Sequence, residues 1–246
     1  LPTIKSLINK KAKIIIISHL GRPKGQIVPA LTLKPVAKKL SNYLNQDVDF
    51  LDKNTGNNVI KKSKEMPSGK VLLLENLRFS KDEELNTVSF AKELSKNGDI
   101  YINEAFSCSH RAHTSVSEIT KHIESFAGKM LFEEVNFIKM LTSDAKKPVT
   151  CIIGGSKIST KIGVLSNLIK KMENVIIVGA MANNFIKYKG YNIGKSLFEK
   201  NQENLLKDIT EKCKTNNCNL VLPEDVIVAK DKKSKGQLKT LDKIRL

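Results

Sequence analysis

Residues 70–79 read KVLLLENLRF, a short apolar run that is followed at once by polar and charged residues. The run has the length of a strand, and its unbroken apolar character is typical of a parallel strand covered by helices on both faces. In sheets of this class, ligands bind beyond the carboxyl ends of the strands. Arg78 therefore lies where a functional residue is expected, and the same pattern recurs along the chain.

Other segments share this composition and alternate with amphipathic stretches of helical period. The strand candidates, beside Lys70–Glu75, are Lys13–Ser18, Asp47–Leu51, Asp99–Asn103, Val149–Ile153, Asn174–Val178 and Asn219–Leu222. The helix candidates include Leu33–Leu44, Thr87–Ser95, Lys161–Lys171 and Asn204–Thr215. This alternation predicts an α/β fold with parallel sheets.

One helical stretch interrupts the alternation. Gly128–Leu141 carries apolar residues at helical spacing, and a polar segment that ends in a proline follows it. We interpret the stretch as a connecting helix with a linker over residues 128–147, between a first domain over 1–127 and a second over 148–246. The expected fold class is α/β, with two doubly wound parallel-sheet (Rossmann-like) domains joined by this helix.

The composition of the 246 residues is that of a globular protein, with 40% hydrophobic residues. No apolar run approaches the roughly 18 residues of a membrane span, and the first residues lack the layout of a signal peptide, so we expect a cytoplasmic protein without a membrane partner. Cysteine spacing indicates neither a zinc site nor a disulfide framework, and we expect reduced thiols. The four cysteines are Cys108, Cys151, Cys213 and Cys218.

The formal net charge is +17, which indicates either an anionic partner or a compositional bias toward lysine. The lysines are scattered, aromatic residues make up 5% of the chain and tryptophan is absent. Stacking platforms for single-stranded nucleic acid are therefore disfavoured, and we expect no nucleic-acid partner. The lysine-rich stretch Lys230–Thr240 is predicted to be a loop.

Arginines follow three of the predicted strands of the first domain. Arg22 lies in the segment HLGRP (19–23), Arg78 follows the third strand, and Arg111 follows NEAF (103–106). A single arginine at such a place is more often a solvated surface charge, but three beyond one sheet edge would form a cationic basin. Such a basin suits a small, multiply charged anion, whereas a polymer favours an extended stripe of lysines. Further donors could come from His19, His110 and His113.

The first strand of the second domain is followed by GGSKISTK (154–161). Glycines allow a phosphate to approach the backbone, and amides at a helix N-terminus attract it. The glycine spacing fits neither a Walker A loop nor a dinucleotide fingerprint, and an ordinary strand-helix turn is the alternative. A second turn of small residues, 178–183, follows the next strand. Two such turns at one edge predict a groove for a nucleotide.

These stretches occur together, and in this order, in one enzyme family. They are HLGRP (19–23), LLLENLRF (72–79), residues 106–113, GGSK (154–157), GKSL (194–197) and LPxD (222–225). Each is weak alone, but the set is specific, and the chain resembles the phosphoglycerate kinase family over nearly its whole length. It resembles most of that family's two-domain core, truncated at both ends.

The resemblance implies that the first domain binds 3-phosphoglycerate or 1,3-bisphosphoglycerate and the second binds ADP or ATP. A phosphoryl group would pass from 1,3-bisphosphoglycerate to ADP, with Mg²⁺. The implied substrate-binding residues are His19, Leu20, Gly21, Arg22, Arg78 and Arg111. The implied nucleotide-binding residues are Gly155, Ser156, Lys157, Lys161 and Gly179. The implied catalytic residues are Lys157, which matches the lysine that steadies the transferred group, and Arg22. We expect a monomer.

The resemblance also has gaps. The family's first strand and its C-terminal phosphate loop, with the carboxylate for Mg²⁺, have no counterpart here, so we expect the metal ligand outside residues 1–246 and no activity from these residues alone. Val178-Gly179-Ala180 stands where three glycines are common. Two alternatives stay open: a binding module without turnover, and a basic nucleic-acid-associated protein.

Overall fold

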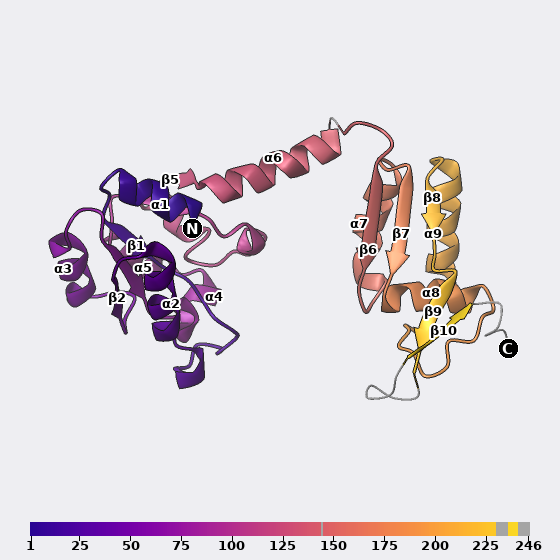
Figure 1. Ribbon diagram of the computed structural model, residues 1–246, viewed down its shortest axis with the longest axis horizontal. Coiled ribbons are helices and arrows are strands. Elements are labelled where there is room, and N and C mark those ends of the chain that lie inside the picture. The colour runs from indigo at the N-terminus through magenta and orange to yellow at the C-terminus, as the bar shows by residue number, and fades with distance from the viewer. Residues whose placement is uncertain (144, 230–235, 241–246) are drawn as a thin grey trace. The chain divides into compact units, whose positions relative to one another are not determined.

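The computed structural model describes residues 1–143, 145–229 and 236–240. The chain divides into two compact units, unit 1 with Leu1–Lys139 and unit 2 with Met140–Leu246. Both units contain parallel strands and helices (Figure 1). The predicted α/β class with parallel sheets is therefore confirmed.

Unit 1 is centred on a parallel sheet with the strand order β1-β3-β2. Its strands are β1 (Ile14–Ile16), β2 (Val48–Leu51) and β3 (Val71–Leu74), and its flanking helices include α2 (Lys34–Leu44) and α3 (Asn57–Glu65). The central strand β3 is buried along its length. Leu72 and Leu74 belong to a cluster with Val59 of α3, whereas Leu73 belongs to one with Ala37 of α2. Helices thus cover both faces of this sheet, as the unbroken apolar run predicts.

The rest of unit 1 surrounds a pair of parallel strands, β4 (Ile100–Asn103) and β5 (Glu124–Ala127). The remaining helices are α1 (Pro2–Asn9), α4 (Lys81–Leu85), α5 (Val88–Ser95) and the 3-10 turns η1 (Pro29–Leu31), η2 (Leu77–Phe79), η3 (Phe106–Cys108) and η4 (Glu118–Lys121). Strand β5 was not predicted, because its four residues mix charged, polar and apolar side chains. Its backbone pairing with β4, more than twenty residues earlier, makes it a strand.

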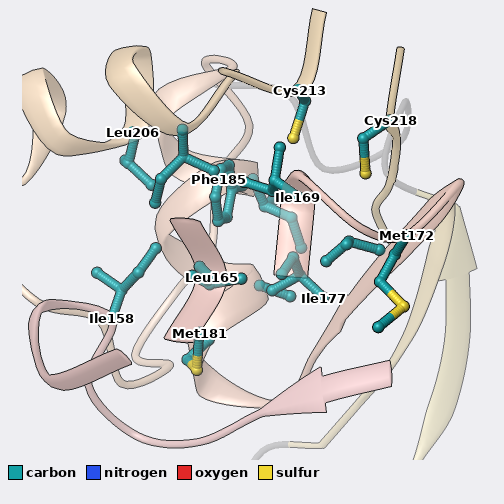
Figure 2. Packing of buried hydrophobic residues seen from close by; sticks show 14 residues of the cluster. Ile158, Leu165, Ile169, Met172, Ile177, Met181, Phe185, Leu206, Cys213 and Cys218 are labelled. Atoms are coloured by element: carbon teal, nitrogen blue, oxygen red, sulfur yellow. The ribbon is translucent and has the colours of Figure 1, made fainter. Parts of the chain in front are cut away.

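Unit 2 contains a parallel sheet with the order β6-β7-β8. Its elements are β6 (Thr150–Gly154), η5 (Ser159–Lys161), α7 (Ile162–Ile169), β7 (Asn174–Val178), α8 (Ala180–Tyr188), α9 (Glu203–Thr215) and β8 (Asn219–Val221). One hydrophobic cluster joins the strands to the three helices, and Figure 2 shows Leu165, Ile177 and Phe185 at its centre. All three side chains are at most 2% exposed.

The sheet of unit 2 is covered less evenly than that of unit 1. Val175 and Ile177 of β7 are fully buried, but Ile152 of β6 is 67% exposed. The expectation that helices cover both faces therefore holds for β3 and is wrong for β6 within the described residues. β6 is also an edge strand of this sheet, paired with β7.

The stretch predicted to be a loop, Lys230–Thr240, contains a strand at its end. β10 (Gln237–Thr240) pairs in antiparallel register with β9 (Asp225–Val228). Polar composition suggested a loop, whereas pairing with a strand several residues earlier decides the backbone conformation. Residues 230–235 of the predicted loop lie outside the described residues.

Helix α6 (Lys129–Ser143) coincides with the predicted connecting helix and crosses the division between the units. The carboxylate of Glu104, just after β4, accepts hydrogen bonds from the backbone N–H groups of Met130 and Leu131, at 3.4 and 3.0 Å. These donors have no partner inside a helix, so Glu104 stabilises the start of α6. Within the part of the chain that the structure describes, no helix is long and apolar enough to cross a membrane.

Candidate functional site

Asn76 joins the loops that follow β1 and β3. Its side-chain amide donates to the carbonyl oxygens of Leu20 and Leu31, at 2.8 and 2.9 Å, and its side-chain oxygen accepts the N–H of Arg78 at 3.1 Å. Asn76 is fully buried, so these bonds form in a medium where they are strong and costly to lose. The loop with His19 is therefore fixed relative to Arg78.

Glu75 makes a similar connection one residue earlier. Its carboxylate accepts the hydroxyl of Thr32 at 2.6 Å and the N–H of Leu33 at 2.9 Å, at the start of α2. Glu75 and Asn76 belong to the motif that the sequence singled out, and the structure places both in the frame beneath Arg78.

Arg78 is buried, although its charge requires compensation. Its Nη1 donates to the carbonyl oxygen of Gly21 at 2.9 Å, and its Nε lies 3.7 Å from a carboxylate oxygen of Glu84. That Nε is buried and has no hydrogen-bond acceptor among the described residues. A buried guanidinium with an unused donor retains capacity for an anion.

The pKa of His19 depends on the charges around its imidazole. Burial is the largest cause that lowers the pKa of its imidazole below the usual 6.5, and nearby positive charges lower it further. These charges come from Arg78, His113 and Arg111. Glu84 acts in the opposite direction. The structure thus brings His19, Arg78 and Arg111 together, from three loops that were predicted to meet at one sheet edge.

The other predicted residues of this cluster differ in exposure. Leu20, Gly21 and Arg22 are exposed on the loop after β1, and Gly21 has a φ of +66°, which favours glycine. His110 is exposed, whereas His113 is buried, with its Nδ1 3.8 Å from a carboxylate oxygen of Glu83. His113 therefore faces an acidic partner inside the protein.

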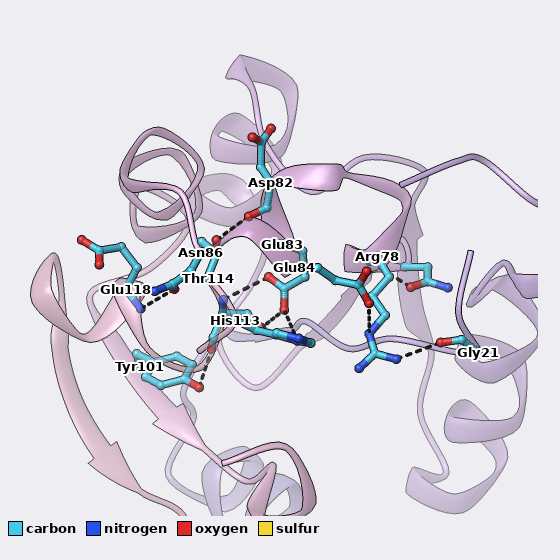
Figure 3. Close-up of polar contacts among 12 residues, drawn as sticks. Gly21, Arg78, Asp82, Glu83, Glu84, Asn86, Tyr101, His113, Thr114 and Glu118 are labelled. Carbon is cyan, nitrogen blue, oxygen red and sulfur yellow. Dashed lines mark hydrogen bonds and ion pairs between the residues drawn. The ribbon is translucent and has the colours of Figure 1, made fainter. Parts of the chain in front are cut away.

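Two acidic residues on α4 were not predicted from the sequence. Glu83 is 3% exposed and lies beside His113, and Glu84 lies beside Arg78 (Figure 3). The signal was present in the run Asp82-Glu83-Glu84, which begins four residues after Arg78. An acidic run is usually a solvated helix start, and only the fold shows that one member is buried.

The two glycine turns of unit 2 meet, as predicted. The carbonyl oxygen of Gly155 accepts the N–H of Met181 at 3.0 Å, and a Cβ at Gly179 would lie 3.9 Å from backbone atoms of Gly155. A Cβ at Gly154 would come within 2.9 Å of the Val178 side chain. Val178, the bulkiest departure from the glycine-rich pattern, therefore occupies space that a glycine at 154 leaves open.

The helical amides after this turn are partly occupied. Glu199 accepts the N–H of Ser159 at 3.1 Å and its hydroxyl at 2.5 Å. These bonds lower the pKa of the Glu199 carboxyl, and the bond from the Ser159 hydroxyl has the largest effect. The charge of Lys157 lowers this pKa further. The N–H of Ser159 is thus taken by a carboxylate. The N–H groups of Gly155, Ser156 and Lys157 precede it.

The predicted lysines of this turn are accessible. Ser156, Lys157 and Lys161 are exposed, with Lys161 at the end of η5 and Lys157 before it. The backbone turn, the exposed lysines and the nearby Gly179 all lie after the carboxyl ends of β6 and β7. This is the edge where parallel α/β sheets bind their ligands.

Two parallel α/β units, one with a cationic cluster and the other with paired glycine turns and exposed lysines, define a class of proteins built to handle phosphorylated small molecules. The family model for phosphoglycerate kinase matches residues 1–245. The chain belongs to the phosphoglycerate kinase family.

Individual proteins of similar sequence are also phosphoglycerate kinases. The chain is 47% identical over 245 residues to a phosphoglycerate kinase of Wolbachia pipientis from Culex pipiens, a match with 99% of this chain and 62% of that protein. It is 43% identical over 244 residues to a phosphoglycerate kinase of Finegoldia magna, again 62% of that protein. The chain therefore spans about three fifths of the length of the curated relatives that it matches.

Solved structures give the same result. The structure of phosphoglycerate kinase from Coxiella burnetii matches with a TM-score of 0.79 at 36% identity, over 99% of this chain and 62% of the other. The enzyme from Pyrococcus horikoshii matches with a TM-score of 0.80 at 28% identity, over 98% and 62%. The predicted family is confirmed.

Proposed function

We propose that the intact gene product is a phosphoglycerate kinase of glycolysis. It transfers a phosphoryl group from 1,3-bisphosphoglycerate to ADP, giving 3-phosphoglycerate and ATP, and catalyses the reverse reaction. The observation that carries the proposal is the grouping of the charges of Arg78 and Arg111 around His19, from three loops, with Arg78 buried beside Gly21 and Glu84.

The glycerate substrate is proposed to bind in unit 1. Its phosphate and carboxylate groups are anions of the kind that buried arginine forks recognise. Arg78 and Arg111 supply charge, and the exposed loop after β1 supplies donors around them. The proposed contacts are His19, Leu20, Gly21, Arg22, Arg78 and Arg111.

The nucleotide is proposed to bind at the glycine turns of unit 2. Gly155 and Gly179 allow its close approach to the backbone, and Ser156, Lys157 and Lys161 are exposed toward solvent. Because Glu199 occupies the N–H of Ser159, the phosphates would be held by the residues before it.

In the proposed mechanism, Lys157 and Arg22 are the catalytic residues. Phosphoryl transfer spreads negative charge over the oxygens of the moving group, and positioned cations stabilise that charge. Lys157 would supply such a cation beside the nucleotide in unit 2, and Arg22 beside the glycerate substrate in unit 1. Both side chains are exposed to solvent, so a substrate oxygen can approach them.

Mg²⁺ is proposed to arrive with the nucleotide, where it neutralises phosphate charge. Among the described residues, no group of three or more His, Cys, Asp or Glu could hold a metal ion. The carboxylate beside Lys157, that of Glu199, is already bonded to Ser159. A Mg²⁺ ion bound to the nucleotide phosphates would supply neutralisation of their charge.

The wider assignments are proposed on the same basis. Residues 1–127 form the glycerate domain, 128–147 the connecting helix and linker, and 148–246 the nucleotide domain. The protein is proposed to be a cytoplasmic monomer without nucleic-acid or membrane partners.

The test is to assay the intact gene product in both directions with Mg²⁺, together with three variants. Arg78→Ala should weaken use of 3-phosphoglycerate by about 1.5–3 kcal/mol in kcat/KM and leave the KM for ATP unchanged, because it removes a charged hydrogen-bond donor. Lys157→Ala should lower turnover by roughly 10²–10³. Lys61→Ala, in an exposed pair with Glu65, should behave as wild type.

The proposal fails if the wild-type protein shows no transfer in either direction. The glycerate assignment fails if Arg78→Ala alters the KM for ATP as strongly as that for 3-phosphoglycerate. A protein that binds both ligands without turnover would be a binding module.

A further inference from the structure

Glu83 has an unusual position for a carboxylate. It is 3% exposed, inside the short helix α4, and it faces the segment that follows Arg111. A buried carboxylate is unfavourable unless hydrogen bonds and positive charge compensate it. The contacts of Glu83 therefore indicate what the residue is for.

These contacts form a clamp on Ser115. One carboxylate oxygen accepts the N–H of Ser115 at 3.0 Å, and the other accepts its hydroxyl at 2.6 Å. The second oxygen also lies 3.8 Å from the imidazole Nδ1 of His113. Both carboxylate oxygens of Glu83 therefore have partners, which lie on Ser115 and His113.

The backbone of α4 extends the clamp to Thr114. The carbonyl oxygen of Glu83 accepts the N–H of Thr114 at 2.9 Å, and that of Asp82 accepts the Thr114 hydroxyl at 2.7 Å. Figure 3 shows Thr114 and His113 on one side of Glu83, and Arg78 with Glu84 on the other. The helix that follows Arg78 in the chain therefore fixes the segment 113–115.

Arg111 lies two residues before this fixed segment and is half-buried. Its own described backbone bond, from its N–H to the carbonyl oxygen of Cys108, is local. The described bonds that tie its loop to the segment after Arg78 are those of the clamp, between Asp82 and Glu83 on one side and Thr114 and Ser115 on the other.

We propose that Glu83 is a positioning residue for the proposed glycerate site of unit 1. Through Ser115 and Thr114, it fixes the positions of Arg111 and His113 relative to Arg78 and His19. The inference rests on the proposed function, because it names that site's supporting residue. Glu83 does not touch the substrate. Its effect is on the geometry of Arg111 and His113, which come from one loop.

The experiment compares Glu83→Gln and Ser115→Ala in the intact gene product, with Glu93→Gln as the control. Gln has the size of Glu, but it offers one acceptor oxygen in place of two. Ser115→Ala removes only the bond from the Ser115 hydroxyl to Glu83, so it is the milder change. It tests the proposal even if Glu83→Gln folds poorly. Glu93 forms an exposed ion pair with Lys96, three residues later in the chain.

Glu83→Gln should raise the KM for 3-phosphoglycerate about tenfold, since a small displacement of binding groups is costly, and change the KM for ATP less than twofold. Ser115→Ala should raise the same KM about threefold. The double variant should be no worse than Glu83→Gln alone, because both changes break one connection. Glu93→Gln should match wild type. Equal changes in both KM values, or an unchanged KM for 3-phosphoglycerate, would overturn the proposal.

A direct binding measurement separates this inference from the kinase assignment. Isothermal titration calorimetry of the wild-type protein and of Glu83→Gln gives the dissociation constant for 3-phosphoglycerate and requires no turnover. Weaker binding by the variant supports the positioning role even if the wild-type protein lacks kinase activity. Equal binding by the two proteins overturns the role even if the kinase assay succeeds.

Discussion

At the scale of single residues, His19 provides the sharpest prediction. Its pKa is lowered by burial and by three nearby cations, so the imidazole is neutral at neutral pH in the free protein. A phosphate anion bound beside these cations cancels part of their effect, and the pKa of His19 should rise. By linkage, the affinity for the proposed substrate 3-phosphoglycerate should increase as pH falls through the interval between the pKa of His19 in the complex and its lower pKa in the free protein.

The measurement is an NMR titration of the imidazole signals with and without 3-phosphoglycerate. His122 is the internal control, because its Nε2 lies 3.3 Å from Glu118, outside the cluster. A titration midpoint of His19 that does not move on adding the anion would remove His19 from the site. The same lowered pKa implies that the free protein loses some stability as pH falls below 6.5, since the unfolded chain then binds the extra proton more readily.

The sequence pointed to the arginines of the candidate site, but not to the carboxylates beside them. Arg78 and Arg111 could be recognised because each follows a predicted strand, and strand ends of a parallel sheet converge. Glu83 and Glu199 could not, since their serine partners lie 32 and 40 positions away in the chain. A polar bond over that separation leaves no periodic signal, and it becomes visible only when the fold brings the two segments together.

At the scale of elements, the turn between β7 and α8 allows a stability prediction. Gly179 has φ +67° and ψ −154°, a conformation that is almost restricted to glycine. A Cβ there would make only ordinary contacts at 3.9 Å, so the cost of Gly179→Ala arises from the backbone. We expect a loss of about 1–3 kcal/mol in the free energy of unfolding, measured by denaturant titration.

The matched control is Gly163→Ala in the first turn of α7. A Cβ at Gly163 meets nothing within 4 Å, and its φ lies outside the positive region. Alanine is favoured over glycine inside a helix, so this variant should gain about 0.5–1 kcal/mol. Equal effects of the two substitutions would mean that the strain at Gly179 is not real.

Elements could be predicted from sequence where a local pattern was strong. The unbroken apolar run within residues 70–75 predicted β3, and the helical spacing of apolar residues in Gly128–Leu141 predicted α6. The strands β5, β9 and β10 were missed. The residues of β5 and β10 mix polar and apolar types, whereas β9 is a three-residue apolar run after Asp225 and is short for a strand signal. Pairing with other strands, a non-local backbone interaction, makes all three segments strands.

At the scale of the whole molecule, the net charge of +17 raises the question of nucleic-acid binding. The cationic residues that the fold brings together, such as Arg78 and Arg111, form a compact cluster in which one guanidinium is buried. A compact cluster contacts few phosphates of a polymer. We expect weak binding of a DNA oligomer, with a shallow dependence on salt, measured by fluorescence anisotropy between about 50 and 200 mM salt. A logarithmic slope of about −6 or steeper would instead indicate an extended contact surface.

The clamp of Glu83 on Ser115 has a consequence for how this protein can change over generations. Ala at position 115 would leave a buried carboxylate oxygen without its hydroxyl donor, whereas an apolar residue at 83 would leave a buried hydroxyl and N–H without an acceptor. Each single replacement is therefore harmful. Replacing both residues removes the orphaned hydroxyl, but the buried N–H of residue 115 still needs an acceptor, so Glu83 should be the less replaceable of the two. Related chains that keep Glu at 83 should therefore keep a hydroxyl residue at 115, whereas Ser159, whose bonds to Glu199 are exposed to water, should vary more freely.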